Sequence, residues 1–264
     1  MPNGAWRTTL FRLTDRWVTR LLRGIRAVHE GLWLGLSNRE MLHEITGRQY
    51  SAWEQYQGRD YNESDLFPWE KMALDCYFVE CRTILLGASG GGREILALAK
   101  RGIQVDAFEC SAALVESSRA LVVSKGITAR VLLSLPDQVP QEFGIYDGLI
   151  MGFGGYAHIA GHQARIRFLK QFRRHVRPGG PILLSFFPRA DSRQARWTFA
   201  IARFIRRARG SGETVDLGDT ISVVFEHYFS KEEIESELKD SGFRLEHFSE
   251  YPYGRAVGRA MEET

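Results

Sequence analysis

The sequence predicts a doubly wound α/β fold, in which a mostly parallel sheet of seven strands carries an N-terminal helical cap. After residue 66, short apolar runs alternate with helical patterns, as expected when crossover helices join parallel strands. The runs are apolar throughout, as in strands that are buried on both faces. With 264 residues, 44% of them hydrophobic and 25% charged, the chain can bury the core of one large domain and an accessory segment.

Residues 1–65 form the predicted cap, and its first element is an amphipathic cationic helix. Between residues 9 and 29, apolar side chains recur at steps of three and four, and arginines follow the opposite side. We expect this helix to pack on the body of the protein or on a second copy, as a homodimer contact. Attachment to an anionic membrane surface is the alternative.

An aromatic stretch follows between residues 50 and 69. Its rings can dock the cap onto the main domain, or they can contact a substrate, because aromatic side chains serve both packing and recognition. The candidates for substrate contact are Tyr50, Trp53, Tyr56 and Tyr61.

Residues 66–264 form the predicted main domain. Five strands are expected over 83–86, 104–108, 129–133, 146–151 and 181–187, each followed by a helix. Residues 221–229 and 243–250 are the expected sixth and seventh strands, and the helix between them begins after Ser230 and ends before Gly242. The pattern leaves open whether these last two strands are parallel or antiparallel.

Composition and charge exclude several classes of protein. A formal net charge of +3 is too small to indicate a nucleic-acid-binding protein. Three cysteines without a Cys-x-x-Cys pair indicate neither a disulfide framework nor a cysteine zinc site, and they fit a reducing cytoplasm. Arginines interrupt the N-terminal apolar residues, so we expect no signal peptide and no stable membrane insertion. Because no group of His, Asp and Glu has metal-ligand spacing, we expect no metal.

The end of the first predicted strand is where a ligand should bind, because ligands of open α/β sheets lie beyond the carboxyl ends of the strands. There the chain reads Gly-Ala-Ser-Gly-Gly-Gly over residues 87–92 and then enters a helix. Glycines let the backbone approach a ligand, and a helix N-terminus offers free N–H groups to an anion. Seventeen residues beyond Gly92, Glu109 ends the second strand, where a carboxylate can accept both hydroxyl protons of a ribose.

This segment resembles motif I of class I S-adenosylmethionine-dependent methyltransferases, whose common form is acid-x-Gly-x-Gly-x-Gly. The matching positions are Leu86, Ala88, Gly90 and Gly92, so leucine replaces the usual acid and alanine the first glycine. The dinucleotide pattern Gly-x-Gly-x-x-Gly does not fit. Similarity to the family continues in the fourth strand and in a helix, Pro-Gly-Gly turn and fifth strand over 169–187, and it covers about residues 66 to 250.

The resemblance implies that S-adenosylmethionine is the cofactor. It also implies that the methyl group moves to an oxygen or nitrogen of a small molecule or peptide-like metabolite. Glu109 matches the family's ribose-binding acid, and Asp137 matches the position that meets the adenine amino group. The implied cofactor-binding residues are Gly87, Ala88, Ser89, Gly90, Gly92, Glu109, Cys110, Asp137, Gly152 and Phe153.

Three residues are candidates for the reaction itself. His158 follows the fourth strand by a few positions, in a segment that resembles the family's junction of donor and acceptor pockets, and it is the first candidate for a base. The aromatic face of Tyr156, like that of Phe153, is a candidate to stabilise the sulfonium charge. His227, in the predicted sixth strand, is the second histidine candidate.

Three alternatives remain open from the sequence. A non-catalytic scaffold that keeps the fold is suggested by Leu86 and Ala88, which depart from motif I. A nicotinamide-dependent oxidoreductase would use Glu109 for an adenosine ribose in a different loop geometry. Methylation of a nucleic acid, guided by the basic N-terminal helix, is the third, although the small net charge disfavours it.

Overall fold

The computed structural model describes residues 5–262. The helices are α1 (Ala5–Leu36), α2 (Arg39–Ala52), α3 (Glu54–Gln57), α4 (Arg59–Asn62), α5 (Pro68–Tyr77), α6 (Arg93–Lys100), α7 (Ala112–Ser124), η1 (Gly155–His158), α8 (His162–Arg173), α9 (Arg193–Ala208) and α10 (Lys231–Asp240). The strands are β1 (Thr83–Gly87), β2 (Gln104–Glu109), β3 (Val131–Leu133), β4 (Gly148–Met151), β5 (Pro181–Pro188), β6 (Asp219–Ile221), β7 (Phe225–Phe229), β8 (Phe243–Ser249) and β9 (Gly254–Ala260).

Seven of these strands form the predicted doubly wound, mostly parallel sheet, which the structure confirms. Strands β3, β2, β1, β4 and β5 lie side by side and run parallel. Strand β9 lies antiparallel to β5, and β8 lies antiparallel to β9, so β8 runs in the same direction as β5. The strand order reverses between β1 and β4, and a ligand crevice is therefore expected at their carboxyl ends.

The predicted sixth strand is confirmed only over residues 225–229, because residues 221–229 form part of a hairpin outside this row. Strands β6 and β7 pair antiparallel around a turn in which the Ser222 N–H donates to the Val224 carbonyl oxygen at 3.2 Å. Strand β7 adds to the sheet at the end of β5, where Phe187 pairs with Tyr228. The described part of the sheet thus has nine strands.

Strand β9 was missed because its sequence is poor in the β-branched and aromatic residues that favour strands. It lies close to β5: a Cβ atom at Gly254 would be 2.5 Å from the carbonyl oxygen of Phe186. Glycine lets the backbones of β9 and β5 approach each other. The glycines that make β9 hard to recognise in the sequence are therefore required for its packing on β5.

The helix predicted after the third strand is also wrong, since residues 134–147, all described, contain none. Pro136, Pro140 and Gly144 interrupt this segment, and proline both removes an N–H donor and disfavours a helix before it. Strands β3 and β4 are shorter than predicted; Tyr146, expected in a strand, makes an isolated bridge to Val176.

Helices cover both faces of the sheet, as a doubly wound fold requires. On one face, α8 and α10 pack with the sheet through Phe168, Phe172, Ile234 and Leu238. On the other, α5, α6 and α7 contribute Leu74, Ile95, Leu98 and Val115 to a second apolar cluster.

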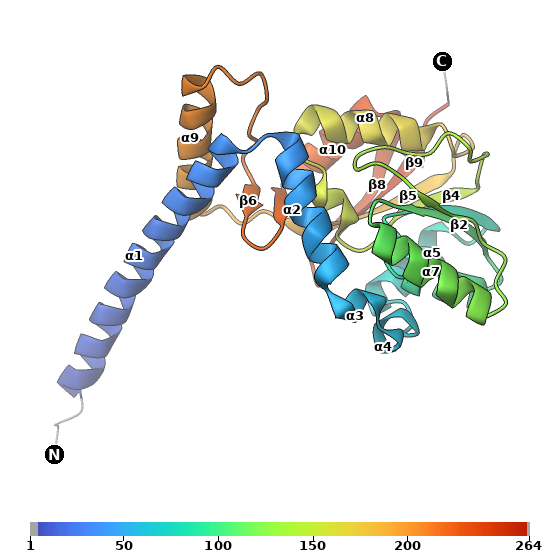
Figure 1. The fold of residues 1–264 in the computed structure, drawn as a ribbon, viewed down its shortest axis with the longest axis horizontal. Coiled ribbons are helices and arrows are strands. Elements are labelled where there is room, and N and C mark those ends of the chain that lie inside the picture. Colours follow the sequence, from blue (N-terminus) through green and yellow to red (C-terminus); the bar gives the residue numbers. More distant parts are fainter. Residues whose placement is uncertain (1–4, 263–264) are drawn as a thin grey trace.

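The N-terminal helix is longer than predicted, and it packs on the body of the protein only through its C-terminal part, where Ala27 and Leu34 are buried. Helix α1 lies along α9 and projects well beyond the rest of the chain (Figure 1). Two glycines of α1 allow this close contact. A Cβ at Gly31 would lie 2.8 Å from the Cβ of Ile201, and a Cβ at Gly35 would lie 2.7 Å from the Cβ of Ile205. Among the described residues, no helix combines the length and apolarity needed to span a membrane.

Helices α2, α3 and α4 form the part of the N-terminal segment that covers the sheet's carboxyl edge (Figure 1). They lie directly on the glycine loop: a Cβ at Gly91 would be 2.2 Å from the Tyr56 carbonyl oxygen and 2.3 Å from Asn62 Nδ2. Only glycine fits at this position. The glycines of the loop are therefore needed both for its turn and for its contact with the cap.

Candidate active site

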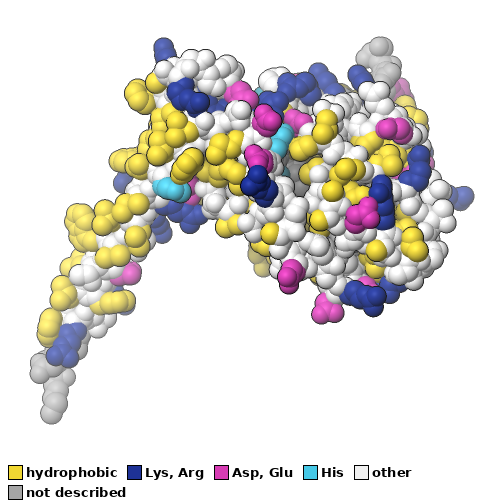
Figure 2. Space-filling model, viewed as in Figure 1, with side chains coloured by type: hydrophobic (Ala, Val, Ile, Leu, Met, Phe, Trp, Pro, Cys, Tyr) yellow, Lys and Arg dark blue, Asp and Glu magenta, His cyan; other side chains and the backbone are white. Residues whose placement is uncertain are grey.

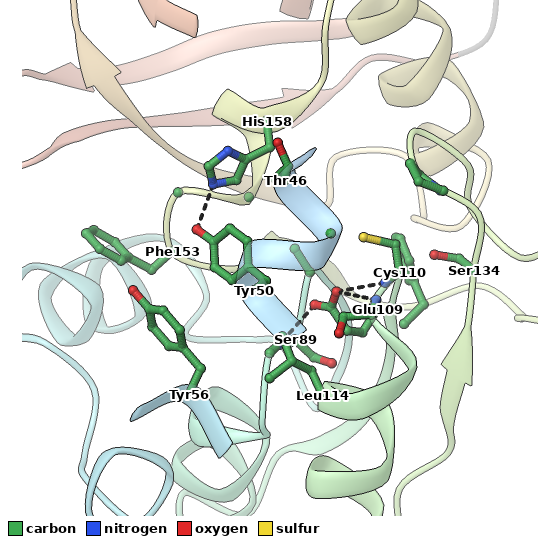
Figure 3. A pocket seen from close by; sticks show the side chains of 18 of the residues that line it. Thr46, Tyr50, Tyr56, Ser89, Glu109, Cys110, Leu114, Ser134, Phe153 and His158 are labelled. Atoms are coloured by element: carbon green, nitrogen blue, oxygen red, sulfur yellow. Dashed lines mark hydrogen bonds between the residues drawn. The ribbon is translucent and has the colours of Figure 1, made fainter. Parts of the chain in front are cut away.

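A cavity of about 730 Å³ lies between the cap and the carboxyl ends of β1, β2 and β4. Its size falls within the roughly 300–1,000 Å³ usual for small-molecule sites. Figure 3 shows side chains of the cap and of the sheet pointing into the same space. The predicted residues that line it are Tyr50, Trp53, Tyr56, Tyr61, Ala88, Ser89, Gly90, Glu109, Cys110, Asp137, Phe153 and His158.

The glycine loop turns by means of backbone conformations in the left-handed region. Ala88 has φ +51°, Gly90 +54° and Gly92 +103°. Alanine therefore adopts the conformation for which glycine is favoured, although it replaces the first glycine of the motif. Gly87, Gly92 and Gly152 do not line the cavity; they lie beneath it, and a Cβ at Gly152 would be 2.2 Å from the Ala88 carbonyl oxygen.

Glu109 joins the two loops at the floor of the cavity. Its Oε2 accepts from the Gly90 N–H at 3.0 Å, and its Oε1 accepts from the N–H groups of Cys110 at 2.8 Å and Ser111 at 3.0 Å. A carboxylate has about four lone-pair sites, two on each oxygen, so Oε2 can still accept one hydrogen bond from a ligand hydroxyl. The predicted position of this acid at the end of β2 is confirmed.

Four buried polar atoms without a hydrogen-bond partner belong to side chains that line the cavity. They are His43 Nε2, Asn62 Oδ1, Ser89 Oγ and Arg93 Nε. Buried polar atoms are nearly always paired in native proteins, so this concentration indicates a polar ligand. Sequence reasoning missed three of the four. Arg93 directly follows the glycine loop, which was a usable signal, whereas His43 and Asn62 reach the cavity only because the cap folds over it.

Arg93 is held in place by two carboxylates. Its Nη1 and Nη2 donate to Glu70 at 2.8 and 2.7 Å, and Nη2 also donates to Glu94 at 2.7 Å. The guanidinium carbon lies 4.3 Å from the Phe67 ring centroid. These contacts leave Nε as the donor that remains unused at the cavity wall.

A hydrogen-bonded chain runs from the cavity into the protein through Tyr50 and His158 (Figure 3). His158 Nδ1 lies 2.7 Å from the Phe225 carbonyl oxygen, which can only accept, so Nδ1 carries the proton. Nε2 is then the acceptor for the Tyr50 hydroxyl at 2.7 Å. Burial lowers the pKa of His158 and raises the pKa of Tyr50, which keeps both groups neutral near pH 7.

Comparison with known proteins identifies the fold. No family model matches the sequence, and no curated protein matches it. The 1,6-didemethyltoxoflavin-N1-methyltransferase of Burkholderia thailandensis, solved with 1,6-didemethyltoxoflavin and S-adenosylhomocysteine bound, aligns with TM-score 0.61 and 13% identity, over 86% of this chain and 92% of its own. A S-adenosylmethionine-dependent methyltransferase of Methanosarcina mazei aligns with TM-score 0.56 and 18% identity, over 76% and 100%. The amino pentose methyltransferase of calicheamicin biosynthesis from Micromonospora echinaspora, solved with S-adenosylmethionine, aligns with TM-score 0.54 and 13% identity, over 74% and 92%.

The protein has the class I S-adenosylmethionine-dependent methyltransferase fold. In this methyltransferase fold the cavity lies at the switch point of the sheet, as the sequence predicted. Identities this low establish the fold alone, so the reaction must be argued from the residues of the site.

Two of the catalytic candidates lie outside the cavity of this methyltransferase fold, which corrects their prediction. Tyr156 is fully buried; its hydroxyl donates to Glu237 at 2.5 Å, and its ring stacks on Phe229. His227 is also fully buried, and its Nδ1 lies 2.7 Å from Asp219 Oδ1. Both side chains are committed to partners in the protein interior, so neither can reach a substrate in the cavity.

Replacing Ala88 with glycine is expected to stabilise the methyltransferase fold. A left-handed conformation costs an L-residue roughly 1–2 kcal/mol, and the greater chain entropy of glycine offsets only about half of that. Thermal unfolding should therefore shift upward by a few degrees. Ala97→Gly is the control, because Ala97 is buried in helix α6 and glycine should lower its midpoint. A fall in midpoint for Ala88→Gly would contradict the strain argument.

Proposed function

We propose that this protein is an S-adenosylmethionine-dependent methyltransferase that acts on an oxygen or nitrogen of a small molecule. The observation that carries the proposal is a cavity in which the glycine loop and Glu109 meet at the floor and whose lining side chains hold four unpaired polar atoms. A ligand with ribose hydroxyls and a charged end fits this donor and acceptor set. The fold alone would not support the proposal, because one fold hosts many functions.

Particular residues are assigned to parts of the cofactor. Glu109 Oε2 would accept from a ribose hydroxyl, and Asp137 and Cys110 line the side of the cavity assigned to the adenine. Asn62 Oδ1 and Arg93 Nε, an acceptor and a donor without partners, suit the ammonium and carboxylate of an amino-acid end. When bound, the cofactor supplies an electrophilic methyl group on a sulfonium sulfur.

The acceptor pocket is assigned to the aromatic side chains of the cap. Tyr50 lies 4.9 Å from Trp53 and 5.5 Å from Tyr56 between ring centroids, and all three line the cavity. Rings in this arrangement favour a flat or aromatic acceptor. The name of the Burkholderia thailandensis neighbour specifies methylation at N1 of 1,6-didemethyltoxoflavin, which is consistent with this class of acceptor.

The Tyr50–His158 pair would remove the proton that a hydroxyl or ammonium acceptor must lose. The Tyr50 oxygen takes that proton while its own hydroxyl proton passes to His158 Nε2, so the net product is an imidazolium. Glu226 also lines the cavity, and its charge favours the protonated form of His158. The cap would also accelerate the reaction by holding the acceptor in line with the methyl group.

Replacing His158 with glutamine is expected to lower kcat by roughly 10²–10⁴-fold with little change in cofactor affinity. The pKa of His158 is lowered by burial, so the wild-type rate should persist below pH 6.5, the ordinary value, and fall only in more acidic solution. The acidic limb should be absent from the variant's profile. Tyr50→Phe should reproduce the loss of kcat. A variant that keeps the wild-type rate and profile would remove His158 from the reaction.

Calorimetry tests the function directly. We expect saturable binding of both S-adenosylmethionine and S-adenosylhomocysteine, and formation of the latter when methyl-labelled cofactor is incubated with phenols, amino sugars and nitrogen heterocycles. Folded protein that binds neither compound would support the scaffold alternative, whereas saturable binding of a reduced nicotinamide dinucleotide would support the oxidoreductase. Either result would overturn the proposal.

The proposed location is the cytoplasm. Cys76, Cys81 and Cys110 are all free thiols in the structure, and this is consistent with a reducing compartment. Fractionation of cells that express the full chain tests it, and an extracellular protein would contradict it.

A further inference from the structure

Large apolar side chains are exposed from one end of helix α1 to the other, although Ala27 and Leu34 are buried. Trp17, for example, is 70% exposed, in a position that the sequence pattern assigns to the apolar side. The other large apolar side chains of α1 exposed by 40% or more are Trp6, Leu10, Phe11, Leu13, Val18, Leu21, Leu22, Ile25, Val28, Leu32, Trp33 and Leu36. Soluble proteins rarely leave so continuous an apolar surface uncovered, so it marks an interaction site.

Helix α9 extends the same surface. Trp197 is 62% and Phe204 72% exposed, and Figure 2 shows hydrophobic side chains continuing from α1 onto the adjoining helix. The contact between the helices uses other residues, among them Gly31 and Gly35 of α1. We name the exposed apolar side chains of α1 together with Trp197 and Phe204 the α1–α9 surface.

The charge of these two helices is unlike that of the rest of the chain. Helix α1 has six arginines against one aspartate and one glutamate, and α9 has five arginines and no acid, so together they carry a formal +9. Because the whole chain carries +3, the remaining residues carry −6. The two helices that bear the exposed apolar surface are therefore strongly positive, whereas the rest of the chain is negative overall.

Most arginines of α1 lie on the side of the helix away from the apolar residues. At 100° per residue, Leu10, Trp17 and Leu21 fall on one side of the helix, while Arg12 and Arg16 fall on the other. Aromatic and aliphatic side chains can enter the acyl boundary of a bilayer while arginines reach the headgroups with their long stems. A helix of this kind lies in the plane of the interface and does not cross it.

We propose that the α1–α9 surface binds an anionic lipid membrane. Charge complementarity selects this occupant, since a bilayer supplies both acyl chains for the apolar residues and negative headgroups for the arginines. A second copy of the chain would bring two helix pairs, each of formal charge +9, together, and a nucleic acid offers no counterpart for so many aliphatic side chains. The surface lies outside the cavity, and the proposal does not depend on the proposed methyltransferase activity.

Vesicle flotation with the full-length protein tests the proposal. The probes are vesicles of phosphatidylcholine alone and vesicles that also contain phosphatidylglycerol. We expect binding to the anionic vesicles, at least roughly tenfold weaker binding to the neutral ones, and a steep decline of anionic binding with salt. Light scattering after size-exclusion chromatography reports the oligomeric state of the same samples without lipid.

Paired variants separate the apolar and electrostatic contributions. Trp17→Glu combined with Leu21→Glu should lower vesicle binding by at least roughly tenfold, because two exposed anchors are lost. Arg12→Gln, Arg16→Gln and Arg20→Gln together should lower binding to anionic vesicles by a similar factor. The control is Val79→Glu with Val123→Glu, which places the same charges on exposed apolar positions of the main domain and should leave binding unchanged.

Each remaining outcome overturns the proposal. These are absence of binding to anionic vesicles at low salt, binding that the α1 variants do not affect, and equal binding to neutral vesicles. A dimer that the Trp17→Glu/Leu21→Glu variant dissociates, without vesicle binding, would assign the surface to a second copy. Binding to RNA without binding to vesicles would assign it to a nucleic acid.

Discussion

Replacing Glu109 with alanine is expected to weaken S-adenosylmethionine binding by roughly 10- to 100-fold, since the charge-assisted hydrogen bond from a ribose hydroxyl to Oε2 would be lost. The same change frees the N–H groups of Gly90, Cys110 and Ser111, which the carboxylate now holds. The glycine loop would therefore also lose its tie to the start of α7. Titration calorimetry measures the affinity, and circular dichroism checks that the fold is retained.

Two further variants isolate the role of this carboxylate. Glu109→Gln keeps the shape of the side chain but replaces one acceptor oxygen by a donor, so its affinity should be intermediate. Asp106→Asn is the matched control on the same strand. Asp106 pairs with Arg130 and Tyr146, and it does not line the cavity, so cofactor affinity should not change. Wild-type affinity in Glu109→Ala would exclude the residue from the site.

The sheet and the floor of the site could be predicted because local sequence determines them. Buried parallel strands are continuously apolar, and the turn after β1 needs left-handed backbone conformations, which favour glycine at Gly90 and Gly92. Glu109 could be placed because the end of a strand fixes where its last side chain lies. Each of these inferences uses residues that are close together in the sequence.

The rest of the site depends on contacts between distant segments, which a single sequence does not reveal. His43 and Asn62 reach the cavity only through the packing of α2 and α4 over the sheet, and neither belongs to a motif. Tyr156 is the opposite case, because the sequence predicts it in the site and the structure places it outside the cavity. It lies three residues from Phe153, which lines the cavity, yet the turn of η1 directs its ring into the interior, toward Phe229.

The same interior contacts predict the largest change in stability. Glu237 is fully buried and accepts from Arg165 Nε at 2.8 Å and from the Tyr156 hydroxyl at 2.5 Å; its Oε1 also lies 2.8 Å from His162 Nδ1. Arg165 is itself 1% exposed, so the carboxylate compensates a charge that water cannot reach. Removing one partner of a buried pair costs about 3–5 kcal/mol, because the other charge stays buried.

We therefore expect Glu237→Leu to lower the free energy of unfolding by about 3–5 kcal/mol, as measured by urea denaturation. Glu235→Leu is the matched control: it makes the same substitution on α10 at an exposed position, and its unfolding midpoint should stay near that of the wild type. In Glu237→Leu the buried guanidinium keeps only one ion-pair partner, Asp216, which lies 3.2 Å from its Nη2, so adding Arg165→Met should recover part of the loss by removing that buried charge. Equal midpoints for Glu237→Leu and Glu235→Leu would contradict the argument, whereas recovery in the double variant would identify the buried charge of the guanidinium, rather than lost packing, as the cause of the instability.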